Sequence, residues 1–335
     1  MKPLKQKAYG SIPHLRGSRV TPGDHYCEQG QQTIVTEKSR DRKDLVIVQE
    51  KLDGSNVAVA KVNGEILALI RAGYLAETSP YDQHHYFSLW VNKQKKRFES
   101  LLGEGERIVG EWLMQAHGTK YNLPHEPFVV FDIMKGHNRL PYHDFLLRVL
   151  PFGFTIPSLL HIGQPIKIKE VKKILKAKGS AHGAIDEVEG FVYRCERDGK
   201  VDFLAKWVHP NKQDGCYLPE ISNLETVWNT LPERLLENFN LLKLGGSKNP
   251  LPIMSVEEKV TQLLNQNSIA EALNLLLLMS HSLFQKEVKH LLQRWGATEL
   301  KTDETEISKF RSAITMLLND APGKEGRNVG TITLN

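Results

Sequence analysis

The spacing of apolar residues changes along this chain, and that change limits the possible fold more than any other feature. Up to about residue 210, short runs rich in β-branched and aromatic residues alternate with Gly, Pro and Asp. The clearest runs are residues 45–49, 57–61, 108–109, 128–131, 191–193 and 202–205. Helical stretches at residues 87–102 and 168–178 interrupt these runs in no regular βαβ order. This pattern predicts an α+β domain built on antiparallel sheets.

After about Ser255 the apolar residues recur at helical spacing, so the C-terminal third is predicted to be mostly α-helical. A length of 335 residues also favours two domains. Between the β-rich part and the helical part, one segment has the composition of a linker, with Gly245, Gly246, Pro250 and Pro252. We therefore expect a first domain over residues 1–215, a connecting segment over 216–254, a helical domain over 255–320 and a flexible tail over 321–335.

The composition, 40% hydrophobic and 25% charged, is that of a globular protein with a core. The longest apolar run, near residues 272–279, is far shorter than the ~20 residues of a membrane-spanning helix. Nor do the polar residues 1–8 form a signal peptide. Three scattered cysteines, Cys27, Cys195 and Cys216, fit a reducing compartment. We expect a cytoplasmic protein, and nothing in the sequence points to a membrane or to an obligate protein partner.

Positive charge gathers in two short runs, although the net charge is only +5. Residues 93–97 read Lys-Gln-Lys-Lys-Arg, and six lysines fall within residues 167–178. Clustered charge is what a field that attracts a polyanion requires. Each run by itself is more simply interpreted as the solvated face of a helix.

The fragment Glu-Lys-Leu-Asp-Gly-Ser-Asn at residues 50–56 lies between two β-rich runs. On this fragment alone, a hairpin turn and a reactive lysine are equally good interpretations. A lysine amine attacks phosphorus only when it is deprotonated, so a nucleophilic Lys51 would need its pKa lowered by burial or by a neighbouring cation. Gly54 would let the backbone come close to a ligand.

Five further motifs follow this fragment in order. They are Arg-Ala-Gly at 71–73, Gly-Glu-Trp-Leu at 110–113, Val-Phe-Asp-Ile at 130–133, Glu-Val-Glu-Gly-Phe-Val at 187–192 and Phe-Leu-Ala-Lys-Trp-Val at 203–208. With the lysine fragment, they resemble the covalent nucleotidyltransferase superfamily of polynucleotide ligases and RNA capping enzymes. Each motif alone is a weak signal, whereas six in this order over residues 51–208 form a specific one.

The resemblance implies a nucleotide pocket in which Lys51 is the nucleophile that carries AMP as a phosphoramidate. The other nucleotide-binding residues that it implies are Glu50, Asn56, Arg71 at the ribose or the incoming phosphate, Glu111 at the ribose, Phe131 stacked on the base, and Lys206 at the α-phosphate. The last motif of many relatives has two lysines one residue apart, whereas Leu204 and Val208 flank Lys206 here. Either Lys206 makes the phosphate contact alone, or a lysine from elsewhere contributes.

The resemblance also implies ATP as the cofactor, together with a divalent metal, Mg²⁺ or Mn²⁺, held by Asp53 and Glu189. Magnesium favours oxygen ligands and keeps several of its waters, so two carboxylates are a suitable set. The sequence contains no Cys/His pattern for a dedicated metal site. His84 and His85 are adjacent and would point apart, so surface histidines are the simpler interpretation.

Two features favour an RNA ligase within the superfamily. Asn56 stands where DNA ligases and capping enzymes usually have arginine, and predicted helices stand where those enzymes have an OB barrel. Residues 9–19 and 111–124 also resemble ATP-dependent RNA ligases. The resemblance therefore implies an ATP-grasp-like adenylyltransferase domain over residues 1–215.

The implied reaction joins a 3′-hydroxyl to a 5′-phosphate of RNA through a lysyl-AMP enzyme and an adenylated 5′ end. The partners would be RNA ends at a nick in a duplex, in a broken single strand or in a tRNA loop. An ATP-dependent DNA nick ligase and a capping-type guanylyltransferase stay open as alternatives. A binder without catalysis would have lost Lys51 or Glu189, and both are present.

Overall fold

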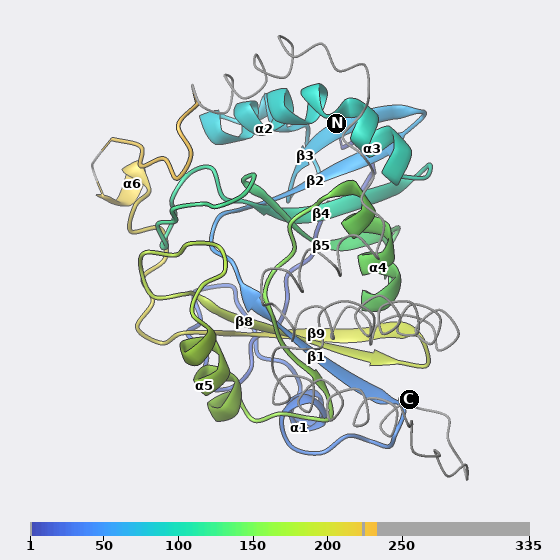
Figure 1. Ribbon diagram of the computed structural model, residues 1–335, viewed down its shortest axis with the longest axis vertical. Helices are drawn as coiled ribbons and strands as arrows, with labels where there is room; N and C mark the ends of the chain where they lie inside the picture. The colour runs from blue at the N-terminus through green and yellow to red at the C-terminus, as the bar shows by residue number, and fades with distance from the viewer. Residues whose placement is uncertain (1, 223–224, 233–335) are drawn as a thin grey trace, which may run out of the picture. The chain divides into compact units, whose positions relative to one another are not determined.

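The computed structural model describes residues 2–222 and 225–232. All of them belong to Met1–Ser255, the first of the two units into which the chain divides. Two antiparallel sheets form this part, a four-stranded sheet in the order β7-β1-β8-β9 and a five-stranded sheet in the order β3-β2-β4-β5-β6 (Figure 1). The expected antiparallel α+β architecture is thus confirmed. The predicted helical domain 255–320, the tail 321–335 and most of the connecting segment 216–254 lie outside the described residues.

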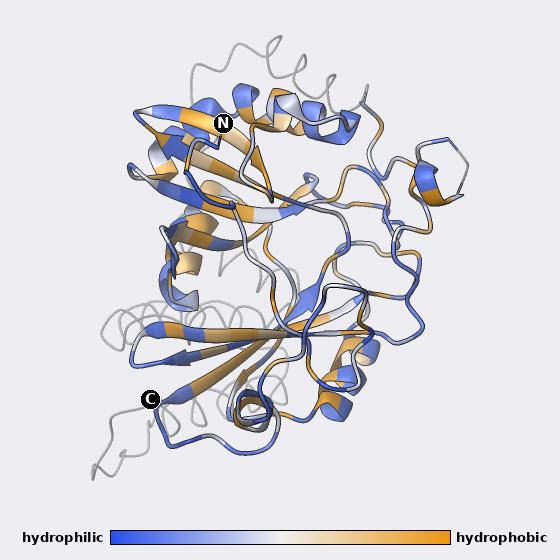
Figure 2. Ribbon diagram, turned by 180° about the vertical axis from the view of Figure 1, so that it is seen from behind, coloured by the Kyte–Doolittle hydropathy of each residue, from blue (hydrophilic) through white to orange (hydrophobic). Residues whose placement is uncertain are grey.

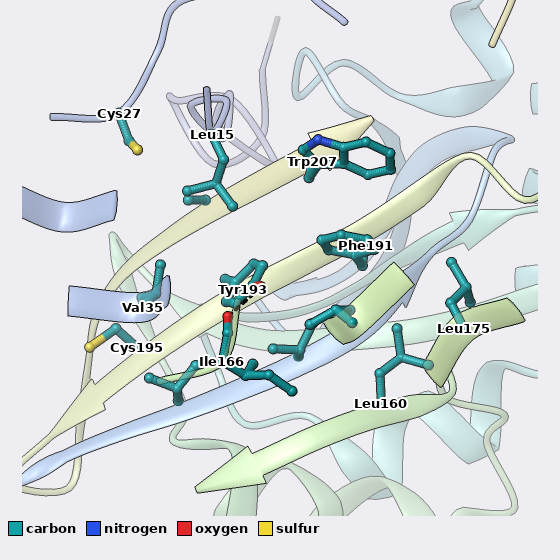
Figure 3. Close-up of a cluster of buried hydrophobic side chains, with 14 residues drawn as sticks. Leu15, Cys27, Val35, Leu160, Ile166, Leu175, Phe191, Tyr193, Cys195 and Trp207 are labelled. Atoms are coloured by element: carbon teal, nitrogen blue, oxygen red, sulfur yellow. Dashed lines mark hydrogen bonds between the residues drawn. The ribbon is translucent and has the colours of Figure 1, made fainter. Parts of the chain in front are cut away.

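The four-stranded sheet consists of β1 (Asp44–Lys51), β7 (Leu159–Gly163), β8 (Gly190–Arg197) and β9 (Lys200–Val208). Side chains alternate along a strand, so Phe191 and Tyr193 face one side of β8 while Val192 and Arg194 face the other. The first side packs against helices α1 (Gln29–Thr36) and α5 (Ile168–Lys178) in a closed core. In this core the Tyr193 hydroxyl donates a hydrogen bond of 2.8 Å to the Ile166 carbonyl (Figure 3). The opposite side of the sheet is left to line a pocket.

The five-stranded sheet consists of β2 (Ser55–Val62), β3 (Glu65–Ile70), β4 (Glu106–Trp112), β5 (Phe128–Lys135) and β6 (Asn138–Arg139). Helices α2 (Asp82–Lys93) and α3 (Lys95–Leu101) contact β3, and a cluster of aromatic rings that includes Phe87, Trp90 and Trp112 fills the space between. The remaining elements are η1 (Ala76–Thr78), α4 (Tyr142–Val149), η2 (Leu150–Phe152) and α6 (Pro219–Ser222). Apolar residues follow the strands and the inner sides of the helices, as Figure 2 shows.

Most predicted elements are found, with one difference in the helices. The expected helix over residues 168–178 has those bounds in α5. The stretch expected as one helix over 87–102 instead begins at Asp82 and is divided at Gln94, which caps α2 and precedes α3. The aromatic residues of both helices face one core, which requires the change in direction.

The segment after Lys51 is a crossing between sheets, so the hairpin interpretation is wrong. Lys51 ends β1 in the four-stranded sheet and pairs with Gly190, whereas Ser55 begins β2 in the five-stranded sheet and pairs with Trp112. Residues 52–54 therefore carry the chain from one sheet to the other. This crossing brings side chains from both sheets to a shared pocket.

Gly54 lets this crossing pack closely, and the close approach to a ligand expected for it stays a prediction. A Cβ atom at Gly54 would lie 2.6 Å from the Trp112 carbonyl oxygen and 2.9 Å from a Leu113 methyl group. The absence of a side chain lets the crossing pack directly on the end of β4. A side chain at this position would push residues 52–54 away from the sheet.

We expect Gly54→Ala to lower the free energy of unfolding by about 1–3 kcal/mol, because the methyl group overpacks a site closed by backbone. Urea or thermal unfolding measures the change. Gly30→Ala is the matched control, since a Cβ there meets nothing within 4 Å and the site is helical. A Gly54→Ala protein as stable as the parent would contradict this packing.

In the described part of the chain, no helix is long and apolar enough to cross a membrane. The three cysteines are free thiols, with Cys27 and Cys195 buried and Cys216 partly exposed.

Candidate active site

One pocket gathers residues from both sheets and from the N-terminal segment. Its lining residues are Tyr9, Gly10, Ile12, Gln49, Glu50, Lys51, Leu52, Asn56, Arg71, Glu111, Phe131, Asp132, Pro157, Val192, Arg194, Leu204 and Lys206. All seven residues predicted to bind the nucleotide are among them. The two predicted metal residues, Asp53 and Glu189, lie next to Lys51 but do not line this pocket.

Lys51 forms an ion pair with Glu189, and its Nζ also donates a 3.3 Å hydrogen bond to the Leu52 carbonyl. Burial lowers the pKa of Lys51, but the carboxylates of Glu189, Glu111 and Asp53 outweigh burial and hold that pKa above its usual range. The sequence-based expectation of a lowered pKa is therefore wrong for this arrangement. The amine is an ammonium group here, and it must lose a proton before it can act as a nucleophile.

Glu111 faces Lys51 from the other sheet. The backbone NH of Gly54 donates a 3.2 Å hydrogen bond to its carboxylate, and β2 pairs Asn56 directly opposite it. Burial raises the pKa of Glu111 to about 7, against the effect of Lys51. The side-chain oxygen of Asn56 is buried and has no hydrogen-bond partner among the described residues. Both side chains thus keep acceptor capacity for a ligand.

Glu50 is only 2% exposed, and one of its carboxylate oxygens has no hydrogen-bond partner in the described part of the chain. Ser180 donates a 3.4 Å hydrogen bond to its other oxygen, and His182 Nε2 lies 4.0 Å from the unpartnered one. The second ring nitrogen of His182 is 2.8 Å from His125 Nε2. Burial lowers the pKa of His182 to about 3, so this histidine is neutral. Sequence reasoning missed both histidines, because no motif or period marks them.

Lys206 points into the pocket from β9, and its Nζ lies 3.8 Å from Asp24. Burial and then the charge of Lys51 lower the pKa of Lys206. The N-terminal segment holds this strand in place, since the Leu15 NH donates to the Lys206 carbonyl at 2.8 Å and the Lys206 NH donates to Pro13 at 2.9 Å. Leu204, one of the two residues that flank Lys206 where many relatives have a second lysine, lines the pocket as an apolar surface. Among the described residues, Lys51 and Lys206 are the lysines that line the pocket.

Phe131 is half-buried on β5, and its ring meets that of Tyr9 edge to face at a centroid distance of 5.4 Å. The Tyr9 hydroxyl donates a 2.8 Å hydrogen bond to the Asp132 carboxylate, which also forms a 2.8 Å ion pair with Arg194. This buried network was not predicted, and it fixes the floor of the pocket behind Phe131. Arg71 is exposed at the rim, where it donates to the Ser11 hydroxyl at 3.2 Å.

The carboxylates of both predicted metal residues, Asp53 and Glu189, raise the pKa of Lys51. Asp53 accepts a 3.0 Å hydrogen bond from Thr119, and its backbone NH donates to the Tyr121 hydroxyl at 3.1 Å. Among the described residues, no group of three or more His, Cys, Asp or Glu side chains could hold a metal ion. Two oxygen ligands fit a cation that keeps most of its waters, as Mg²⁺ does.

His84 is not a surface residue, contrary to expectation. It is 8% exposed and lies between the hydroxyl groups of Ser55 and Ser79, each at 2.6 Å from a ring nitrogen. Burial lowers its pKa to about 4, so it is neutral and fixes the first residue of β2.

Two antiparallel sheets thus contribute to one pocket that is centred on a lysine. Residues 44–208 match the family model described as RNA ligase, so the chain contains an RNA ligase family domain. The match runs from the start of β1 to the end of β9, and so includes every residue predicted for the site.

A curated relative, the uncharacterized protein MJ0414 of Methanocaldococcus jannaschii, is 23% identical over 166 residues, or 49% of this chain and 38% of the relative. An archaeal ATP-dependent RNA ligase, form 1, is 17% identical with a TM-score of 0.35, over 82% of this chain and 57% of that one. A Naegleria gruberi RNA ligase variant with AMP and Mn is 18% identical with a TM-score of 0.37, over 58% of this chain and 59% of that one. The chain spans less than two thirds of each, and the family assignment rests on the sequence match.

Proposed function

We propose that this protein is an ATP-dependent RNA ligase that stores AMP on Lys51 and uses it to join a 3′-hydroxyl to a 5′-phosphate. The observation that carries the proposal is the convergence, in one pocket, of the lysine with acceptors and cations from a second sheet. Glu111 and Asn56 reach Lys51 across the crossing of the chain, and Lys206 reaches it from β9. A lysine in a simple hairpin turn would not be surrounded by these acceptors and cations.

In the first proposed step, the Lys51 amine attacks the α-phosphorus of ATP. A P–N bond forms as the bond to the bridging oxygen breaks, and pyrophosphate leaves. The ammonium group must first give up a proton, and the Glu189 carboxylate that it contacts is the acceptor in place. Lys206 and Arg71 carry positive charge to the same pocket, where they would stabilise charge that builds on the phosphate oxygens.

The residues that would hold a divalent cation are Asp53 and Glu189, mostly through water. When bound, such a cation supplies positive charge at the phosphates. In the second and third steps, AMP moves from Lys51 to a 5′-phosphate, and a 3′-hydroxyl then attacks that phosphorus and releases AMP. Phe131 would stack on the base, and Glu111 would accept a hydrogen bond from the ribose.

Glu50 offers a hydrogen-bond acceptor to the base of a nucleotide. Its carboxylate is buried in the pocket wall with one oxygen unpartnered among the described residues, so a donor from a ligand would satisfy it. Adenine has a donor in its 6-amino group, and guanine has donors in its N1–H and 2-amino groups. Glu50 therefore fits a nucleotide base of either kind, and the choice between ATP and GTP is made by the labelling test.

The test is to incubate the protein separately with labelled ATP and labelled GTP, and to measure acid-labile label on the protein. We expect label from ATP, and a labelling rate that falls about tenfold in Glu50→Gln, because a hydrogen bond to a charged group contributes about 1.5–3 kcal/mol. Glu99→Gln, an exposed residue on α3, is the matched control. Label from GTP alone would establish the guanylyltransferase alternative. If the labelled protein seals nicked DNA but not RNA ends, the protein is instead an ATP-dependent DNA nick ligase.

A further inference from the structure

Helix α5 carries four lysines on one exposed face. Lys169, Lys172, Lys173 and Lys176 follow the spacing i, i+3, i+4, i+7, which places them together on a helix. The opposite side of α5, with Val171 and Leu175 buried, belongs to the core of the four-stranded sheet. Figure 2 shows this division into a polar and an apolar side. We call the four lysines the lysine face.

No described carboxylate forms an ion pair with the lysine face. Glu170 lies on the same helix, yet none of the four lysines pairs with it or with another described carboxylate. The arginines at positions 40, 97, 148 and 197, by contrast, each form such a pair. The four charges lie within about 10 Å along the helix axis, at 1.5 Å per residue. Like charges at this spacing destabilise a helix by a few tenths of a kcal/mol per pair. A binding partner with a row of negative charges would remove that repulsion.

The lysine face is anchored at the end of the sheet that carries Lys51. Lys172 Nζ lies 4.7 Å from the centre of the Trp207 ring, and Trp207 precedes Val208, which pairs with Gly190. Gly190 also pairs with Lys51 on its other side. Trp207 and Lys206 point to opposite sides of β9, so the lysine face and the pocket lie on opposite sides of the four-stranded sheet. Figure 1 shows α5 beside the start of β8.

We infer that the lysine face binds the phosphodiester backbone of the RNA whose end reacts at Lys51. This inference rests on the proposed function for the identity of the polyanion, but not for the existence of the surface. A strand that leaves the pocket at the end of the sheet meets the lysines after it turns around that end. Four lysines neutralise phosphates without reading bases, so the surface would hold RNA of any sequence in register.

The experiment compares the full-length parent with a variant that has alanine at Lys169, Lys172, Lys173 and Lys176. Affinity for a single-stranded RNA with blocked ends is measured by fluorescence anisotropy between about 50 and about 200 mM salt. We expect the slope of log K against log salt to become shallower by about 2.8, which is four contacts at about 0.7 each. Labelling by ATP should stay at the parental rate, because none of the four lines the nucleotide pocket.

Two controls separate this surface from net charge and from helix stability. The first places alanine at four exposed lysines elsewhere, Lys38, Lys43, Lys135 and Lys200. It removes the same charge and should leave the slope nearly unchanged. The second places arginine at the four positions of the lysine face, which keeps the charge and should keep the binding.

An unchanged slope in the lysine-face variant, or an equal loss in the first control, would overturn the inference. So would loss of binding to vesicles of phosphatidylcholine and phosphatidylserine without loss of RNA binding, since the surface would then serve an anionic membrane. The failure of the proposed function has a different signature. In that case the parent takes no label from ATP, while the RNA-binding comparison still gives its own answer.

Discussion

Lys51→Arg should abolish the covalent AMP label while the protein stays folded. Arginine keeps a cation beside Glu189, and its guanidinium group stays protonated and cannot act as the nucleophile. Loss of an attacking group of this kind reduces the rate by a factor on the order of 10⁴ or more, so no label should be detected. Intact mass after incubation with ATP and Mg²⁺ measures the label.

The choice of arginine follows from the ion pair. For a lysine in an open pocket, Lys51→Ala would have little effect on the stability of the fold. The side chain of Lys51 is only 22% exposed, however, and that of its partner Glu189 only 9%. Removing one member of such a pair leaves an uncompensated charge, which can cost about 3–5 kcal/mol. Lys135→Arg, at an exposed position on β5, is the matched control. A normal AMP adduct on Lys51→Arg would end the assignment of the nucleophile.

Glu189→Gln should slow labelling at saturating ATP and raise the Mg²⁺ concentration that is needed. Glutamine keeps the shape of the side chain but removes the charge that attracts a cation, and changes of this kind cost about 10–100-fold in metal affinity or activity. It also removes the carboxylate that Lys51 contacts. The labelling rate across a Mg²⁺ titration measures both effects.

Glu187→Gln is the control for this experiment, since Glu187 lies two residues away with its side chain 60% exposed. It should behave as the parent does. If Glu189→Gln labels at the parental rate at every Mg²⁺ concentration, Glu189 is not a metal residue. If labelling is slowed equally at every concentration, its role lies with the Lys51 proton alone.

The sequence predicted β1, β2, β4, β5, β8, β9 and α5, because each one has its own local pattern of apolar residues. It did not predict β3, β6 or β7. The nucleotide residues were identified from motif order, and all seven line one pocket. Their roles stay predictions until the variants are measured.

What local pattern could not predict depends on distant partners. The Asp-Gly pair at residues 53–54 gives a hairpin signal, but β1 pairs with β8 and β2 pairs with β4, and these pairings decide the sheet to which each strand belongs. The direction of the Lys51 pKa depends on Glu189, 138 residues away, and on Glu111. His125 and His182 likewise meet only after the chain has folded.

The position of the N-terminal segment beside β9 has a consequence for the time at which the site is completed. The Trp207 indole donates to the Gly17 carbonyl, and the contact joins residues 190 positions apart. Ribosomes add about 5–20 residues per second, so the segment that supports Lys206 waits roughly ten to forty seconds for its strand to be synthesised. Late in that interval the nascent chain already contains Lys51, Arg71 and Glu111 but still lacks Lys206, the second lysine of the pocket. A growing chain therefore cannot present the complete pocket until β9 has been made.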